Sequence, residues 1–245
     1  MAEPACGPPV VAALLAVVGR QPYLSLGLLI LSFGLVWSAL FPSRPRVALG
    51  SALAAAPFGL FEYVFYVPEY WSPEQWRVAW VGFGDLLFTF AAGGVAWLLA
   101  TTPCGIHLTV AWRSRRVARR FLGCTAIGLA LATLIWKAGL PMYLASLLAM
   151  GIGWACVVWR YSGLRWLGLV GGPAFAAVYL LLLRLTYGLA PDFHLQWNAE
   201  TLTGAALAGV PIEEVLWALT FGAAWPSFMA YVLEARPAAP RPVSR

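Results

Sequence analysis

The sequence predicts an all-α polytopic membrane protein with about seven transmembrane helices. Of its 245 residues, 61% are hydrophobic and only 11% are charged, whereas an ordinary soluble domain carries about 25% charged residues. The mean hydropathy is +0.77. A soluble fold of this length could not bury so much apolar surface and still cover itself with polar groups. The composition therefore excludes a soluble enzyme, a secreted disulfide scaffold and a disordered chain.

Seven apolar stretches are long enough to be read as spans, since a transmembrane helix takes roughly 20 residues. In chain order they cover about 23–41, 47–67, 78–100, 121–136, 142–159, 167–188 and 201–233. The fourth is the shortest, and Pro211 interrupts the last. The apolar run from Val10 to Val18 is too short to span, and we expect it either to lie at the membrane interface or to be tucked into the fold.

The basic residues predict an orientation for these helices. With seven spans, twelve arginines fall on one side, in the segments 42–46, 101–120, 160–166 and 234–245. The opposite side carries three basic residues: Arg20, Arg77 and Lys137. Because basic residues collect on the cytoplasmic side, we expect a multi-pass protein of the cell (inner) membrane with its N-terminus outside and its C-terminus in the cytoplasm. The run RSRRVARR (113–120) would then contact anionic lipid headgroups, and no nucleic acid is expected as a partner.

An internal repeat divides the chain. VGFGDLLFTFAAGGVAW (81–97) aligns without gaps to GVPIEEVLWALTFGAAW (209–225), which places Asp85 opposite Glu213. Parallel repeats of this kind usually meet around a shared central cavity. The sequence thus predicts a single membrane domain over 1–245, made of a first three-helix repeat (22–100), a basic cytoplasmic loop with a linking helix (101–140), a second three-helix repeat (141–233) and a disordered tail (234–245).

Two adjacent acids in the last apolar stretch, Glu213 and Glu214, are the strongest candidates for chemistry. They lie roughly 18 Å into that stretch at 1.5 Å per residue, where a charged acid costs on the order of 2.5–3.5 kcal/mol. An acid kept protonated there can deliver a proton to an apolar substrate. Alternatively, the pair is structural and bonds to Arg184 or to backbone groups freed by Pro211. We expect Pro211 to kink the helix and open room beside the acids.

Three further polar residues fall at a similar depth in the other stretches. Asp85 is the repeat-mate of Glu213 and a third candidate catalytic acid. Glu62, near the end of the second stretch, is expected either to contact a substrate or to reach the interface. Arg184 is expected to pair with an acid as a structural clamp. Their shared depth predicts one polar cluster.

Aromatic residues crowd both halves of the predicted cluster. We expect four of them to contact a substrate: Trp71, Trp197, Trp217 and Phe221. An aromatic face attracts a cation, so such a pocket could steady a carbocation. Interface belts and core packing are the alternative explanation for aromatic residues in a membrane protein.

No cofactor and no metal is expected. The sequence has no HExxH, GxGxxG, P-loop or Ser-His-Asp pattern, and its four cysteines lack metal-type spacing. A retinal-binding seven-helix protein would need a lysine inside its last helix, but the single lysine, Lys137, falls in a loop.

The segment TGAALAGVPIEEVLWALTFGAAW (203–225) resembles the signature of the integral-membrane lycopene cyclase domain, with its Pro-x-Glu-Glu motif followed by aromatics. The duplication and the length resemble the fused two-repeat form. The resemblance implies an isomerase of carotenoid biosynthesis that closes β rings on the ψ ends of lycopene without net redox change. Glu213 and Glu214 would be its acid–base pair and Pro211 would shape their helix. Its partners would be membrane lipid, a hydrophobic carotenoid such as lycopene, and other enzymes of the carotenoid pathway.

The first repeat departs from this pattern. It has GFGD (82–85) where the family carries a second Pro-x-Glu-Glu. The enzyme would then have an altered activity, cyclise only one end of its substrate, or be inactive. Two alternatives stay open at this point. One is a non-catalytic carotenoid- or isoprenoid-binding protein with the same fold. The other is a CAAX-type intramembrane protease, although residues 215–233 lack the arginine and histidines expected of that family.

Overall fold

The computed structural model describes residues 19–42, 45–75, 77–102, 108–110 and 114–237. The main helices are α2 (Pro22–Leu40), α3 (Pro45–Ala55), α5 (Phe83–Thr101), α6 (Ser114–Lys137), α7 (Met142–Arg160), α8 (Arg165–Leu189) and α9 (Ile212–Val232). Short helical segments extend or join them: η1 (Ala56–Phe61), α4 (Glu62–Phe65), η2 (Ser162–Leu164) and η3 (Pro191–Gln196). Within the described residues, seven helices are long and apolar enough to cross a membrane, with α3, η1 and α4 forming one of them. The all-α polytopic class is therefore confirmed.

The only strands in the described part of the chain form three short antiparallel pairs. They are β1 (Arg77–Val78) with β2 (Val81–Gly82), β3 (Leu108–Thr109) with β6 (Arg236–Pro237), and β4 (Ala206–Leu207) with β5 (Val210–Pro211). The β1–β2 hairpin leads into α5 and the β4–β5 hairpin leads into α9. Each hairpin therefore sets the point at which a central helix begins.

The predicted starting residue of the last span, about residue 201, was wrong. Residues 201–211 form turns and the β4–β5 hairpin, and α9 begins only at Ile212. Glu213 and Glu214 therefore lie in the first turn of a helix rather than near its middle. Pro211 precedes the helix with an extended backbone (φ −51°, ψ 139°), so it does not kink the helix.

The fourth span also differs from its prediction. Helix α6 has 24 residues, because the basic run from Arg115 onward is helical rather than part of a loop. Residues 103–107 and 111–113 of the predicted basic loop, the run from Val10 to Val18 and the tail beyond Pro237 lie outside the described residues.

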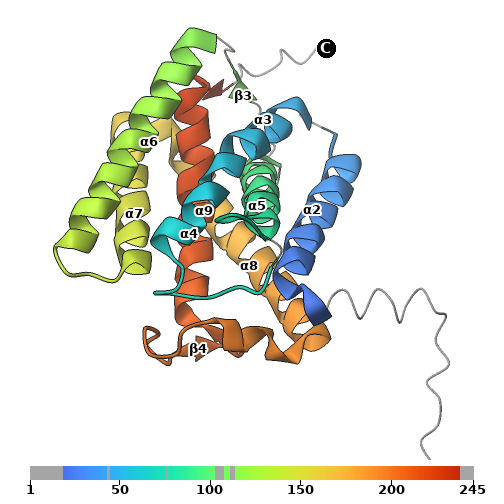
Figure 1. Ribbon diagram of the computed structural model, residues 1–245. Helices are drawn as coiled ribbons and strands as arrows, with labels where there is room; N and C mark the ends of the chain where they lie inside the picture. Colours follow the sequence, from blue (N-terminus) through green and yellow to red (C-terminus); the bar gives the residue numbers. More distant parts are fainter. Residues whose placement is uncertain (1–18, 43–44, 76, 103–107, 111–113, 238–245) are drawn as a thin grey trace, which may run out of the picture.

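Helices α5 and α9 form the centre of the bundle (Figure 1). α5 packs against α2 and α3, α9 packs against α7 and α8, and α5 also contacts α8 and α9. In the most apolar segment of α5, 67% of the residues are buried. In the corresponding segment of α6, only 6% of the residues are buried. α6 is therefore a peripheral helix that lies beside α7.

The two hairpin–helix units have the same geometry at a constant spacing of 129 residues. Ala79 and Ala208 both adopt a positive φ, of 57° and 51°. Gly93 of α5 approaches the backbone of α3 at Ser51, and Gly222 of α9 approaches the backbone of α8 at Gly171. This register differs by one residue from the gapless alignment of the two sequences, so it places Asp85 opposite Glu214 rather than Glu213. The duplication itself stays a prediction.

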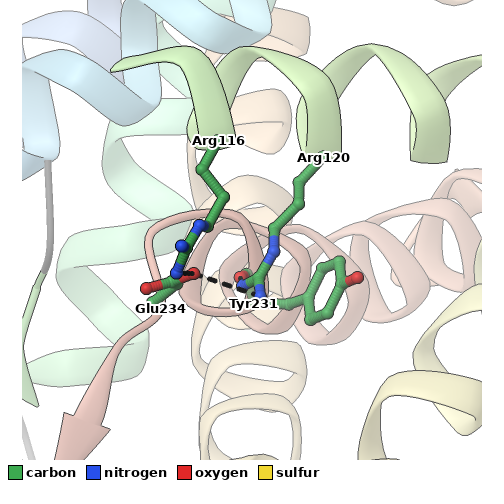
Figure 2. Close-up of polar contacts among 4 residues, drawn as sticks. All are labelled: Arg116, Arg120, Tyr231 and Glu234. Atoms are coloured by element: carbon green, nitrogen blue, oxygen red, sulfur yellow. Dashed lines mark hydrogen bonds and ion pairs between the residues drawn. The ribbon is translucent and has the colours of Figure 1, made fainter. Parts of the chain in front are cut away.

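One end of the bundle is fastened by arginines (Figure 2). Arg116 and Arg120, in the first two turns of α6, each lie 3.1 Å from the Glu234 carboxylate just beyond α9. Arg120 also donates a hydrogen bond of 2.9 Å to the carbonyl of Tyr231 and lies over the ring of that residue. These contacts join the start of α6 to the end of α9.

Candidate active site

A cavity of about 730 Å³ lies between the helices of the bundle and is partly open, since its lining includes the exposed Ile127 and Ile152. Residues of α4, α6, α7 and α9 line most of it, and α2, α5 and α8 contribute at one end. Its lining is mainly aliphatic and aromatic. Glu62 and Glu214 are the only acidic residues among the described residues that line it. The end of the bundle that holds them is called the carboxylate end below.

Glu214 is buried and accepts three hydrogen bonds from side chains. Tyr70 and Trp197 donate to its Oε1 at 2.7 and 2.9 Å, and Tyr179 donates to its Oε2 at 2.5 Å. The residue also lies in the first turn of α9, where the helix dipole favours a negative charge. An ionised carboxylate acts only as an acceptor, and this arrangement supplies it with donors on both oxygens.

The Tyr70 hydroxyl is held in its donor form. Burial and the neighbouring Glu214 carboxylate raise the pKa of Tyr70 above its ordinary value. Burial likewise raises the pKa of Tyr66, whose hydroxyl donates a 2.7 Å hydrogen bond to Ser146. Both phenols therefore remain protonated at neutral pH.

Glu62, at the start of α4, is the second carboxylate of the cavity. It is half-buried, and its Oε1 accepts a 2.8 Å hydrogen bond from the indole of Trp71. Trp71 pairs with Trp197, the indole donor to Glu214, and their ring centroids are 5.6 Å apart. The structure thus brings together two acids that are far apart in the sequence.

Glu213 is 2% exposed and does not line the cavity. Its Oε1 accepts a 2.7 Å hydrogen bond from the backbone N–H of Thr203, while its Oε2 is buried and has no hydrogen-bond partner among the described residues. Glu213 therefore ties the turn before β4 to the start of α9. The two members of the acid pair point to different environments.

Asp85 is also buried and does not line the cavity. Its Oδ1 accepts a 2.7 Å hydrogen bond from the amide of Gln75, which precedes the β1–β2 hairpin. Its backbone carbonyl accepts a hydrogen bond from Thr89. Asp85 thus fixes the loop before α5, as Glu213 fixes the loop before α9.

Among the described residues, Arg184 forms no salt bridge with an acid. It is exposed on α8, and its guanidinium faces Gly209 in the turn of the β4–β5 hairpin. The salt bridges found among the described residues join Arg116 and Arg120 to Glu234. The structural alternative in which Arg184 pairs with Glu213 or Glu214 is therefore wrong.

The predicted aromatic residues lie together on the cavity wall. Trp71, Trp197, Trp217 and Phe221 all line it. The rings of Trp217, Phe221 and Trp225 stack along one face of α9, with centroids 5.1 and 5.8 Å apart. This stack lines the cavity beyond the two carboxylates.

Three tyrosines of the site were missed by the sequence analysis. Tyr70 adjoins Trp71 in the aromatic loop, and that loop was a usable signal. Tyr179 sits within an apolar helix and carries no local signal. Tyr23, in α2, lines the cavity with a buried hydroxyl that has no hydrogen-bond partner among the described residues.

One part of the chain is similar to a known protein family. Residues 140–232 match the family model described as "Lycopene cyclase". No curated protein and no solved structure matches the chain. The matched segment contains α7, α8 and α9, and therefore Glu214, Tyr179 and the aromatic stack. The resemblance predicted from the sequence is confirmed for this segment, which supports a carotenoid cyclase-like function.

Proposed function

We propose that this protein is a lycopene β-cyclase that uses Glu62 and Glu214 as its acid–base pair. A proton adds to the terminal double bond of a ψ end and gives a tertiary cation. A second double bond of the chain attacks that cation and closes the six-membered ring. The new cation then loses a proton to leave the β ring. Atoms and electrons balance without an oxidant, so the reaction requires no redox cofactor.

The hydrogen bonds suggest how the two acids divide the work. Glu214 accepts three hydrogen bonds from neutral donors, so both of its oxygens already act as acceptors, which suits it to the role of proton acceptor. Glu62 accepts one such bond, from Trp71, and is partly exposed, so it can exchange a proton with water at the carboxylate end. In this assignment Glu62 delivers the proton and Glu214 removes one after ring closure.

The aromatic stack supplies the second element of the mechanism. A cation over the face of a Trp or Phe ring is stabilised by about 0.5–2 kcal/mol, more when it is desolvated. Trp217 and Phe221 line the same cavity as the two acids. The rest of the lining is mainly aliphatic and aromatic, so it brings few nucleophiles near the cation.

This proposal changes the roles that the sequence predicted for three acids. Glu214 keeps its catalytic role, and Glu62 moves from substrate contact to catalysis. Glu213 and Asp85 become positioning residues, because each bonds to the loop before its helix and neither lines the cavity. Lycopene in the cell (inner) membrane is the proposed substrate, with the arginine-fastened end of the bundle facing the cytoplasm.

A CAAX-type protease has less support. His194 is exposed, bonds to the Pro191 carbonyl and does not line the cavity, and His107 lies outside the described residues.

The decisive experiment is expression of the chain in bacteria that accumulate lycopene, followed by chromatography of the pigments. A cyclase converts lycopene to products with one or two β rings, and Glu214→Gln abolishes the conversion while the protein still accumulates. Lycopene that co-purifies unchanged with the wild-type protein would instead establish a non-catalytic carotenoid-binding protein.

A further inference from the structure

The cavity extends along nearly the whole length of the bundle. Both Met142, at the start of α7, and Arg160, at its end, line it, and the helix between them rises roughly 27 Å. Glu214 and Tyr231 mark nearly the same span on α9. Two helices thus indicate a long chamber that runs across the membrane.

The chamber is chemically different at its two ends. Glu62 and Glu214 lie at the carboxylate end, together with Tyr23 and Tyr70. At the other end the lining includes Arg160, Tyr161 and Tyr231, and it contains no acid among the described residues. A volume of about 730 Å³ over that length leaves a mean cross-section on the order of 27 Å², which suits one extended chain.

Two glycines line the chamber, one near its middle and one in its distal half. Gly128 of α6 and Gly153 of α7 both line it, and a Cβ added at either would have no neighbour within 4 Å. Larger side chains there would not meet a packed neighbour. The two glycines therefore leave this part of the chamber lining without side chains.

We propose that the chamber binds one linear carotenoid lengthwise, with one ψ end at Glu62 and Glu214 and the other end near Arg160 and Tyr161. Only one end then meets the acids in each binding event, so a second ring requires the molecule to leave and return reversed. Gly128 and Gly153 accommodate the half that does not react. The chemistry in this inference rests on the proposed cyclase function, but the orientation and the length limit rest on the cavity alone.

The test compares Gly153→Phe with Gly151→Phe, which lies on the same helix but outside the chamber lining and also has open space around it. Each variant is given lycopene or a shortened carotenoid that keeps one ψ end. Conversion and the pigment retained per mole of purified protein are both measured. We expect Gly153→Phe to lower lycopene conversion and retention by roughly tenfold or more and to leave the shortened substrate nearly unaffected. Gly151→Phe should behave like the wild type with both.

Other outcomes separate this inference from the proposed function. Equal handling of lycopene by Gly153→Phe and the wild type would overturn the lengthwise orientation, as would an equal loss with the long and the short substrate. If the wild type retains pigment without converting it, the cyclase proposal fails. The retention data then still decide whether the distal half selects for length.

Discussion

Trp71 and Trp197 face each other across an isolated antiparallel bridge, and each indole N–H holds one of the two cavity carboxylates. Backbone hydrogen bonds flank the pair, from Ser72 to the Gln196 carbonyl at 2.8 Å and from Asn198 to the Tyr70 carbonyl at 2.9 Å. The loop before α5 is thus joined to the loop before α9. This joint fixes Glu62 and Glu214 relative to each other, although they come from different halves of the chain.

The first prediction concerns these two carboxylates. Replacing either by glutamine keeps its size but removes the acid–base group, and in Glu214→Gln the amide also places a donor against the three donors that surround it. We expect each variant to lower turnover by roughly 10²-fold or more, measured in lycopene-containing membranes and normalised to protein amount. Glu200→Gln, at an exposed loop position, should retain full turnover. Full activity of both Glu62→Gln and Glu214→Gln would refute the assignment.

The second prediction distinguishes the two members of the acid pair. In Glu213→Gln the amide oxygen can still accept from the Thr203 N–H, and Glu213 does not face the cavity. Turnover per folded protein should therefore fall much less than in Glu214→Gln. Asp85→Asn should behave like Glu213→Gln, because its oxygen can still accept from Gln75. Turnover is again measured in lycopene-containing membranes and normalised to protein amount. If Glu213→Gln lost as much turnover as Glu214→Gln, Glu213 would be a catalytic residue after all.

The seven helices could be predicted because apolar length alone defines them, but the start of the last helix could not. Residues 201–211 are apolar enough to continue a span, yet Gly204 and Gly209 adopt φ values of 77° each and Ala208 adopts 51°. These conformations build a turn and a hairpin, which glycine permits at low cost. The closely spaced glycines and Pro211 were turn signals, and the hydropathy of the segment masked them.

The acid–base pair was harder to predict for a different reason. Glu213 and Glu214 are adjacent, so their pairing was visible in the sequence, whereas Glu62 approaches Glu214 only through the joint between Trp71 and Trp197. Adjacent residues on a helix point about 100° apart, and here that difference sends Glu214 into the cavity and Glu213 toward Thr203. Sequence patterns give the depth of a residue on its helix more readily than its direction.

The third prediction concerns Tyr179, the tyrosine of α8 that donates a hydrogen bond to Glu214. Tyr179→Phe removes the donor to Glu214 Oε2, and a hydrogen bond to a charged group contributes about 1.5–3 kcal/mol. Turnover should fall by roughly tenfold or more. Tyr187→Phe is the matched control on the same helix, because the buried Tyr187 hydroxyl has no hydrogen-bond partner among the described residues. It should keep turnover near the wild-type value; equal losses in the two variants would indicate a packing effect.

The fourth prediction concerns orientation in the membrane. Ser162 and Glu200 are exposed at opposite ends of the bundle. In a variant whose native cysteines are replaced by alanine, Ser162→Cys should react with an impermeant thiol reagent only after the cells are opened, because the arginine-rich end is expected in the cytoplasm. Glu200→Cys should react in intact cells. Reaction of both from the same side would contradict the span count, and the reverse pattern would invert the orientation.

The last prediction follows from a chamber with acids at one end only. After one ring has closed, the unreacted ψ end lies roughly 27 Å away along α7, out of reach of Glu62 and Glu214. A carotenoid with one β ring should therefore appear first and dissociate before any two-ring product forms. Membranes given labelled lycopene and then a large excess of unlabelled lycopene should keep the label in the one-ring product, because the released molecule must compete to bind again. Continued flow of label into the two-ring product at the rate seen without the excess would show that both ends react in one binding event, and would contradict a single acid site per chamber.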